Sequence, residues 1–399
     1  MEQKARAWRQ CGLFTGLLNS TAMEPRTVTS VRKVKVALVE PFFGGSHRAF
    51  TLGLQRHSQH RIRRYTLPPE LWKWRLRWAA LALSRKILHG PRAHVLLASS
   101  MMDAAHLKAL LGPQAPPMAF YFHENQLGYP TPDSKGTDLH LGIINVASAL
   151  AADVVVFNSR FHRDDFLGRL PGFLRQLPPP RPAGLVAALR RKTRILHPGV
   201  DLPLPPRERA PGDPPVILWN HRWEFDKNPG HFFRVCYQLQ ERGVPFRLIL
   251  LGENSQFVPK PFLNARERLG AQIIHYGWAS TRREYLRWLA LGDVVVSTAS
   301  QENFGIAVVE AVAAGCYPLL PRALSYPEVL PPRMHADHLY RDLPDLLARL
   351  EALLTHPERI AAGRKRRHQA MERYSWERLA PRYDALLSRL APHSLEERR

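Results

Sequence analysis

Residues 293–321, DVVVSTASQENFGIAVVEAVAAGCYPLLP, contain the pattern that decides the fold. The apolar, β-branched run at 293–297 predicts a buried strand, and the polar residues after it predict a turn. Gly305 begins an amphipathic helical pattern and Gly315 ends it, before a second buried strand at 317–320. This order of strand, loop, helix and strand is typical of a parallel α/β sheet.

Two carboxylates, Glu302 and Glu310, bracket the start of that helix. Glu302 lies in the loop, and Glu310 lies more than one turn into the helix. Unpaired N–H groups near Phe304, Gly305 and Ile306 favour an anion at this helix end. A phosphate flanked by two hydroxyl-binding carboxylates would fit a nucleotide sugar, whereas the alternative is an ordinary carboxylate on an ordinary crossover.

Length and composition favour two globular domains. The chain has 399 residues, of which 45% are hydrophobic, and no apolar run reaches the ~20 residues of a membrane span. The first thirty residues are too polar for a secretion signal, so a disordered extension, a transit peptide or an early start codon remain possible. We expect an extension at 1–30, an acceptor domain at 31–200, a linker at 201–215, a donor domain at 216–370, and a helix and tail at 371–399.

The three cysteines, Cys11, Cys236 and Cys316, are odd in number and widely separated. They predict neither a disulfide framework nor a zinc site. Cys236 and Cys316 lie within apolar patterns and are expected in the core. A reducing, cytoplasmic location is therefore expected.

The positive charge is concentrated in the first half of the chain. The net charge is +23, and residues 1–200 hold 29 Lys and Arg against 11 Asp and Glu, whereas residues 201–399 hold 28 against 23. This asymmetry suggests a polyanionic partner that contacts one side of the protein. Residues 56–92 alone hold ten Lys and Arg against one acidic residue, Glu70.

A basic helix with interleaved aromatic residues is predicted at 71–88. Trp74 and Trp78 share one face with leucines, and Lys73 and Arg77 share another. Such a helix could lie on a membrane, or could place cations on phosphates and rings near bases. The alternative is a solvated arginine-rich face with its tryptophans in the core.

In the first half, polar residues follow the ends of predicted strands. Gly44 and Gly45 lie between the strand at 34–39 and a helical run, where backbone could approach a phosphate, although a simple turn is the alternative. The spacing is not GxGxxG, and no GKS or GKT follows. The strand at 118–122 leads into four consecutive polar residues at a ligand-binding edge, His123, Glu124, Asn125 and Gln126.

In the second half, Arg222 and Lys227 follow the predicted strand at 216–219. The two cations could hold a diphosphate and stabilise its charge as it leaves. The alternative is surface ion pairing with Glu224 or Asp226. Because the chain contains no Asp-x-Asp motif, these cations and a helix N-terminus would have to replace Mg²⁺, and no metal cofactor is expected.

Gly44-Gly45, Arg222, Lys227 and Glu302-x7-Glu310 together resemble the retaining GT-B glycosyltransferases over residues 34 to about 390. The resemblance implies an α/β fold of two doubly wound, Rossmann-like domains that face each other across a cleft. It implies a front-face reaction in which the leaving phosphate helps to deprotonate the acceptor. The roles it implies are catalytic for His123, Arg222, Lys227 and Glu302, and donor-binding for Gly44, Gly45, Arg222, Lys227, Glu302, Phe304, Gly305, Ile306 and Glu310, with His123 also lining the acceptor site. From their place at a strand end we expect Glu124, Asn125 and Gln126 to bind the acceptor. From their place on the basic helix we expect Lys73, Arg75 and Arg77 to bind tRNA.

Longer motifs are similar to those of one family, the tRNA-queuosine α-mannosyltransferases. They are EPFFGGSH, YFHENQLGYP, FNSRFH, HPGVDL, WNHRWEFDKNP and ENFGIAVVEA. This resemblance implies transfer of mannose from GDP-mannose to queuosine in the anticodon loop of tRNA-Asp. The basic connectors and the first thirty residues depart from it. The alternatives are a glycosyltransferase for a lipid at a membrane surface and a non-catalytic nucleic-acid-binding protein.

Overall fold

The computed structural model describes residues 32–128, 138–203, 213–253 and 258–392. The expected extension at 1–30, and most of the expected linker at 201–215, lie outside these residues. Residues Lys33–Arg399 form one compact unit. In the described residues, no helix is long and apolar enough to cross a lipid bilayer.

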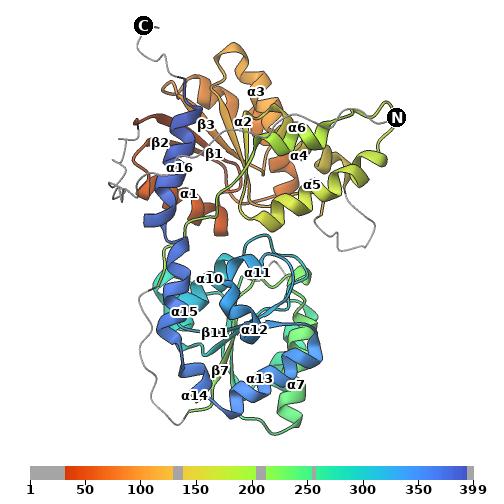
Figure 1. The fold of residues 1–399 in the computed structure, drawn as a ribbon, viewed down its shortest axis with the longest axis vertical. Helices are drawn as coiled ribbons and strands as arrows, with labels where there is room; N and C mark the ends of the chain where they lie inside the picture. The colour runs from red at the N-terminus through yellow and green to blue at the C-terminus, as the bar shows by residue number, and fades with distance from the viewer. Residues whose placement is uncertain (1–31, 129–137, 204–212, 254–257, 393–399) are drawn as a thin grey trace, which may run out of the picture. The chain divides into compact units, whose positions relative to one another are not determined.

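The first half of the chain, coloured from red to yellow-green in Figure 1, forms a parallel sheet. This sheet has six strands in the order β2-β1-β3-β4-β5-β6. Its strands are β1 (Lys35–Glu40), β2 (Arg61–Thr66), β3 (Val95–Ser99), β4 (Met118–Phe122), β5 (Val154–Phe157) and β6 (Thr193–Ile195). Its helices are α1 (Gly45–His57), α2 (Trp72–Leu88), α3 (Ala104–Leu111), α4 (Leu139–Ala151), α5 (Arg160–Arg175) and α6 (Leu185–Lys192).

The second half forms another parallel six-stranded sheet, in the order β12-β11-β10-β7-β8-β9. Its strands are β7 (Val216–Trp219), β8 (Arg247–Leu251), β9 (Ile273–Gly277), β10 (Val294–Val296), β11 (Tyr317–Pro321) and β12 (Leu339–Tyr340). Its helices are α7 (Pro229–Glu241), α8 (Lys260–Arg268), α9 (Arg282–Leu291), α10 (Ile306–Ala313), α11 (Tyr326–Val329), α12 (His335–His338), α13 (Leu343–Thr355), α14 (Glu358–Ala361) and α15 (Arg364–Met371). The stretch at 293–321 forms β10, α10 and β11 as predicted.

Both faces of each sheet are covered by helices, which explains why most strands are continuously apolar. In β1, Val36 and Leu38 contact the core that includes α1, whereas Ala37 and Val39 contact the core formed by α2 to α5. Cys236 and Cys316 are fully buried free thiols, as expected from their apolar surroundings.

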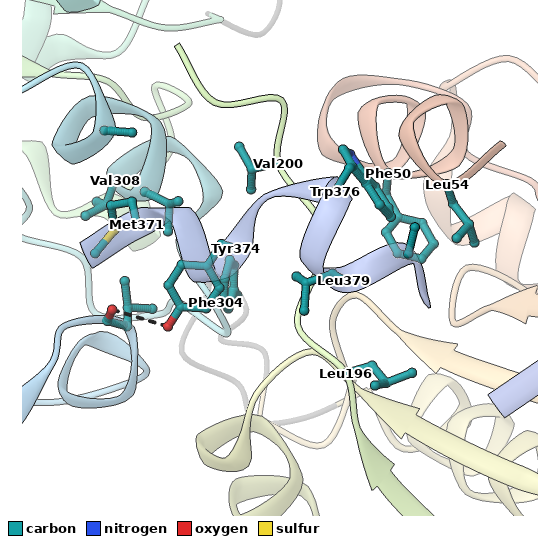
Figure 2. Close-up of a cluster of buried hydrophobic side chains, with 14 of the residues drawn as sticks. Phe50, Leu54, Leu196, Val200, Phe304, Val308, Met371, Tyr374, Trp376 and Leu379 are labelled. Carbon is teal, nitrogen blue, oxygen red and sulfur yellow. Dashed lines mark hydrogen bonds between the residues drawn. The ribbon is translucent and has the colours of Figure 1, made fainter. Parts of the chain in front are cut away.

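The last helix, α16 (Trp376–Leu390), packs against the first sheet (Figure 2). The ring centroid of Trp376 lies 5.8 Å from that of Phe50 on α1. Tyr383 donates a hydrogen bond to the carbonyl of Leu196 at 3.1 Å. The C-terminal helix therefore closes one face of the N-terminal half of the chain.

The strand β2 was not predicted from the sequence. Only Ile62 and Tyr65 of this strand are buried, and Arg61, Arg63 and Arg64 are exposed. Because β2 lies at the edge of the sheet, it tolerates charged residues that a central strand would exclude.

Candidate active site

One cluster of charged residues lies where the order of the second sheet reverses. β7 lies between β10 and β8. The chain therefore leaves the carboxyl ends of β7 and β10 toward opposite faces of the sheet. Open α/β sheets bind ligands in the crevice at such a switch point. Arg222 and Lys227 follow β7, and Glu302 follows β10.

Lys227 is the centre of this cluster. Its buried ammonium donates a hydrogen bond to the carbonyl oxygen of Gln301 at 2.7 Å. Its Nζ lies 3.1 Å from Asp226 Oδ2 and 3.4 Å from Glu302 Oε2. Burial by itself would lower the pKa of Lys227, but Glu302 and Asp226 more than offset it, and the pKa is raised. A fixed positive charge therefore lies beside the Glu302 carboxylate.

Arg222 is held less tightly. Its half-exposed guanidinium lies 3.1 Å from Glu224 Oε1. The two ion pairs offered as the alternative interpretation, with Glu224 and Asp226, thus both form. The pair of Lys227 with Asp226 is buried, whereas the pair of Arg222 with Glu224 is partly exposed. A solvent-exposed ion pair contributes little to stability. A diphosphate could replace Glu224 as the partner of Arg222.

The N-terminus of α10 adjoins this cluster. Gly305 has φ +96°, a left-handed conformation that favours glycine, and no side chain caps the helix there. Ile306 follows as the first helical residue. Phe304 is buried against Tyr374, with ring centroids 5.1 Å apart. The N–H groups of the first turn can therefore bind an anion.

Glu310 lies one turn further along α10 and is buried. Its Oε2 accepts a hydrogen bond of 2.7 Å from the Tyr285 hydroxyl, and its Oε1 lies 2.6 Å from Arg282 Nη2. A carboxylate has about four acceptor positions, so ribose hydroxyls could be bound as well. Tyr285 and Arg282 were missed from the sequence, since nothing local relates α9 to α10.

A second cluster lies at the carboxyl ends of β1 and β4. Glu40 is buried, and its Oε1 accepts a hydrogen bond of 3.0 Å from the Phe42 N–H. Its Oε2 lies 3.0 Å from His47 Nδ1 and 3.5 Å from His123 Nε2. The two imidazole centroids are 4.0 Å apart. Sequence reasoning missed Glu40 and His47, although a carboxylate directly at the end of a buried strand was a usable signal.

The two histidines differ in protonation. Burial lowers the pKa of His47, but Glu40 reverses this effect and the pKa is raised above 6.5. Burial, with a smaller effect of His47, holds the pKa of His123 well below 6.5. The pair with Glu40 therefore favours the charged form of His47, whereas burial favours the neutral form of His123. Glu124 and Arg222 also act on the His47 pKa, so this cluster lies within electrostatic range of the arginine that follows β7.

Glu40, His47 and His123 form the group of described residues best placed to hold a metal ion, with ligand atoms all within 4.8 Å of one another. Two imidazoles and a carboxylate suit Zn²⁺. The raised pKa of His47 instead favours an ion pair with Glu40, because a metal ligand must be neutral.

The glycine loop lies beside this cluster. A Cβ on Gly44 would lie 2.5 Å from Pro69 Cβ, so the close approach of these two segments requires glycine. Gly45 begins α1, and nothing lies within 4 Å of the position where its Cβ would be. The backbone here is open to a ligand.

The other predicted acceptor residues are dispersed. Asn125 is fully buried, and its Oδ1 accepts hydrogen bonds from the N–H groups of Leu127 and Gly128 at 3.0 and 3.2 Å. Gln126 is buried as well, and its N–H donates to Asn145 Oδ1 at 2.8 Å. These contacts shape the loop after β4.

The predicted cations of α2 lie at or near the surface. Lys73 and Arg77 are exposed, whereas Arg75 donates a 3.1 Å hydrogen bond from its Nε to the Pro68 carbonyl. The structure therefore groups His123 with the glycine loop, and places the predicted tRNA-binding cations on the outer face of α2.

Two doubly wound sheets with charged residues at strand ends, and a last helix that returns to the first sheet, define a GT-B glycosyltransferase. Solved structures share this fold. Sucrose-phosphate synthase from Thermosynechococcus elongatus has a TM-score of 0.67 at 15% identity, covering 90% of this chain and 99% of that one. HepE from Anabaena, in complex with UDP and glucose, has a TM-score of 0.65 at 15% identity, covering 89% of this chain and 100% of that one.

The family follows from the sequence comparisons. Residues 35–200 match the family described as tRNA-queuosine alpha-mannosyltransferase N-terminal, and residues 203–352 match glycosyl transferases group 1. A protein of Drosophila melanogaster named tRNA-queuosine alpha-mannosyltransferase is 35% identical over 378 residues, which cover 89% of this chain and 96% of that protein. The chain belongs to the tRNA-queuosine α-mannosyltransferase family and is a hexosyltransferase.

Proposed function

We propose that this enzyme transfers mannose from GDP-mannose, with retention of configuration, to queuosine in the anticodon loop of tRNA-Asp. The family match supports the acceptor and the sugar. The observation that carries the donor chemistry is the Lys227 ammonium, fixed beside Glu302 at the switch point of the second sheet. We also propose a cytoplasmic location, which a tRNA substrate and two free buried thiols favour.

In this proposal the donor binds across the ends of β7 and β10. Arg222, Lys227 and the N–H groups at the start of α10 hold the diphosphate. Glu302 contacts the sugar hydroxyls and Glu310 the ribose. The backbone at Gly44 and Gly45 approaches the diphosphate from the first sheet.

The reaction then needs charge stabilisation more than a protein nucleophile. The bond between the sugar C1 and the phosphate oxygen breaks while the acceptor oxygen bonds to C1 on the same face. The acceptor proton passes to an oxygen of the leaving diphosphate, whose charge Arg222 and Lys227 stabilise. His123, neutral through burial, lines the site and can donate or accept a hydrogen bond with sugar or acceptor.

We infer that no metal takes part, because two cations and a helix N-terminus can neutralise the diphosphate. EDTA should therefore leave turnover unchanged. Loss of turnover with EDTA, restored by Zn²⁺, would instead assign a metal to Glu40, His47 and His123.

The test of the function is direct. Purified protein is incubated with GDP-mannose and queuosine-containing tRNA-Asp, and nucleosides are measured by mass spectrometry. Queuosine should gain one hexose, whereas tRNA lacking queuosine and reactions with UDP-glucose should gain none. Absence of hexose from the queuosine tRNA would reject the proposed acceptor.

Glu310→Ala tests the donor site. This change removes the proposed ribose ligand, so KM for GDP-mannose should rise about tenfold or more, since hydrogen bonds to a charged group contribute about 1.5–3 kcal/mol. Steady-state kinetics with Glu351→Ala as a control on the exterior of α13 would measure it. An unchanged KM would remove Glu310 from the donor site.

A further inference from the structure

The outer face of α2 carries large apolar side chains in contact with solvent. Leu71, Trp74, Trp78 and Leu81 are 73%, 64%, 53% and 43% exposed. Their spacing of three or four residues aligns them in one stripe along the helix. The alternative interpretation, which placed these tryptophans in the core, is wrong, because the core contacts of α2 are made by Ala79, Ala80, Leu83 and Ile87 on the other face.

Cations flank this stripe on the same helix. Lys73, Arg77, Arg85 and Lys86 are all exposed. In the part of the chain that the structure describes, none of the four makes an ion pair with a carboxylate. The exposed arginines of β2, which contacts α2, extend the positive surface. The surface therefore offers aromatic rings and uncompensated positive charge together.

The stripe begins beside the glycine loop. The Phe43 N–H donates to the Leu67 carbonyl at 3.1 Å, and Pro69 packs on Gly44. Leu71, the residue before α2, has φ +49°, a strained conformation for leucine. From Trp74 to Leu88 the helix runs on for about 21 Å. A ligand on the stripe would thus reach from the edge of the active site across the outer surface.

We propose that the outer face of α2 is the docking surface for the tRNA acceptor, on which unstacked nucleobases stack against Trp74 and Trp78 while Lys73 and Arg77 bind phosphates. The inference rests on the proposed function and adds where the tRNA lies. Aromatic rings beside cations suit single-stranded loop nucleotides, which present base faces and phosphates at once. Charge complementarity and continuity with the glycine loop favour RNA over a bilayer at this surface.

The decisive variant is Trp74→Ala/Trp78→Ala in the full chain. Both rings are exposed, so folding should be retained, as thermal unfolding would verify. Affinity for queuosine tRNA, measured by fluorescence anisotropy, should fall at least about tenfold. Trp74→Phe/Trp78→Phe should restore most of it, because a phenyl ring still stacks. Trp278→Ala, an equally exposed tryptophan after β9, is the matched control and should bind as the wild type does.

A second variant, Lys73→Gln/Arg77→Gln, tests the phosphate contacts. The slope of log affinity against log salt should become smaller by about one to two. Unchanged tRNA affinity and salt slope in both variants would overturn the proposal. Loss of binding to phosphatidylserine vesicles with unchanged tRNA affinity would assign the face to a membrane. If the wild type modifies the tRNA and the variants bind it normally, the proposed docking surface is rejected and the proposed function stands. If the wild type adds no hexose, the proposed function itself is rejected.

Discussion

At the scale of the residue, Lys227 joins the two sides of the donor site, because one ammonium contacts groups that follow β7 and β10. The sequence predicted Lys227 as a diphosphate ligand but not its contact with Glu302. A five-residue spacing after a strand is a local pattern, whereas the neighbouring strand that supplies Glu302 is set by the sheet order.

Lys227→Ala should abolish detectable transfer. Loss of one fixed donor to a developing charge costs about 10²- to 10³-fold in kcat, and here the buried Asp226 and the partly buried Glu302 also lose their cation. Single-turnover mannose transfer would measure it, with Lys227→Arg as the charge-preserving control. Wild-type turnover by the alanine variant would remove this residue from the mechanism.

Glu40→Gln should change the protonation of His47. In the wild-type protein Glu40 holds the His47 pKa above 6.5 against the effect of burial. Without the carboxylate, burial dominates and the pKa should fall below 6.5, so His47 becomes neutral at pH 7. NMR titration of the imidazole would follow this, and activity should fall at neutral pH and recover partly in acid. The control is Glu70→Gln, an exposed carboxylate of the same domain; an unchanged His47 titration would contradict the pairing.

At the scale of the element, α16 and α2 show that hydrophobic periodicity predicts a helix but does not always predict which face is buried. Both were predicted as helices, and α16 lies within the helix and tail expected at 371–399. The buried face of α2 could not be chosen, since Trp74 and Trp78 on one side and Leu83 and Ile87 on the other are equally apolar. Packing against α3 and α4 buried the face that carries Ala79 and Ala80 together with Leu83 and Ile87.

Trp376→Ala should destabilise the fold through α16. Trp376 is 1% exposed and lies between α1 and the segment before β7, so truncation leaves a cavity in the core. The expected loss is about 3–5 kcal/mol in the free energy of unfolding. Urea unfolding followed by circular dichroism would measure it. Trp74→Ala, which deletes an exposed ring, should change the stability by less than about 0.5 kcal/mol.

At the scale of the whole molecule, buried neutral histidines make the protein sensitive to acid. Burial lowers the pKa of His162 and His221 to about 3, and that of His338 to about 4. The unfolded chain binds these protons near pH 6.5, so it holds more protons than the folded state below that pH. Stability should therefore fall as pH decreases from about 6.5 towards 4, by up to about 1.4 kcal/mol per pH unit for each histidine. His47, whose pKa is raised, acts in the opposite direction.

The pH dependence of the urea midpoint between pH 7 and 4.5 would test this. His162→Phe removes one of the titrating groups, whose ring lies beside those of Phe122 and Phe157. For this variant, the free energy of unfolding should change less steeply with pH than for the wild type, by about 1.4 kcal/mol per pH unit. A slope equal to that of the wild type would show that His162 is already protonated in the folded protein.

The sequence by itself determined the local features of this protein: two series of parallel strands, the helix that starts at Gly305, and the polar residues at strand ends. Apolar runs, glycines and capping residues act over a few positions, so they can be recognised along the chain. Only the tertiary structure decided which strand ends adjoin, which brought Glu302 to Lys227, Arg282 to Glu310 and Glu40 to His123. It also decided that α2 exposes its tryptophans, because the choice between two apolar faces is made by the packing of distant segments rather than by the helix itself.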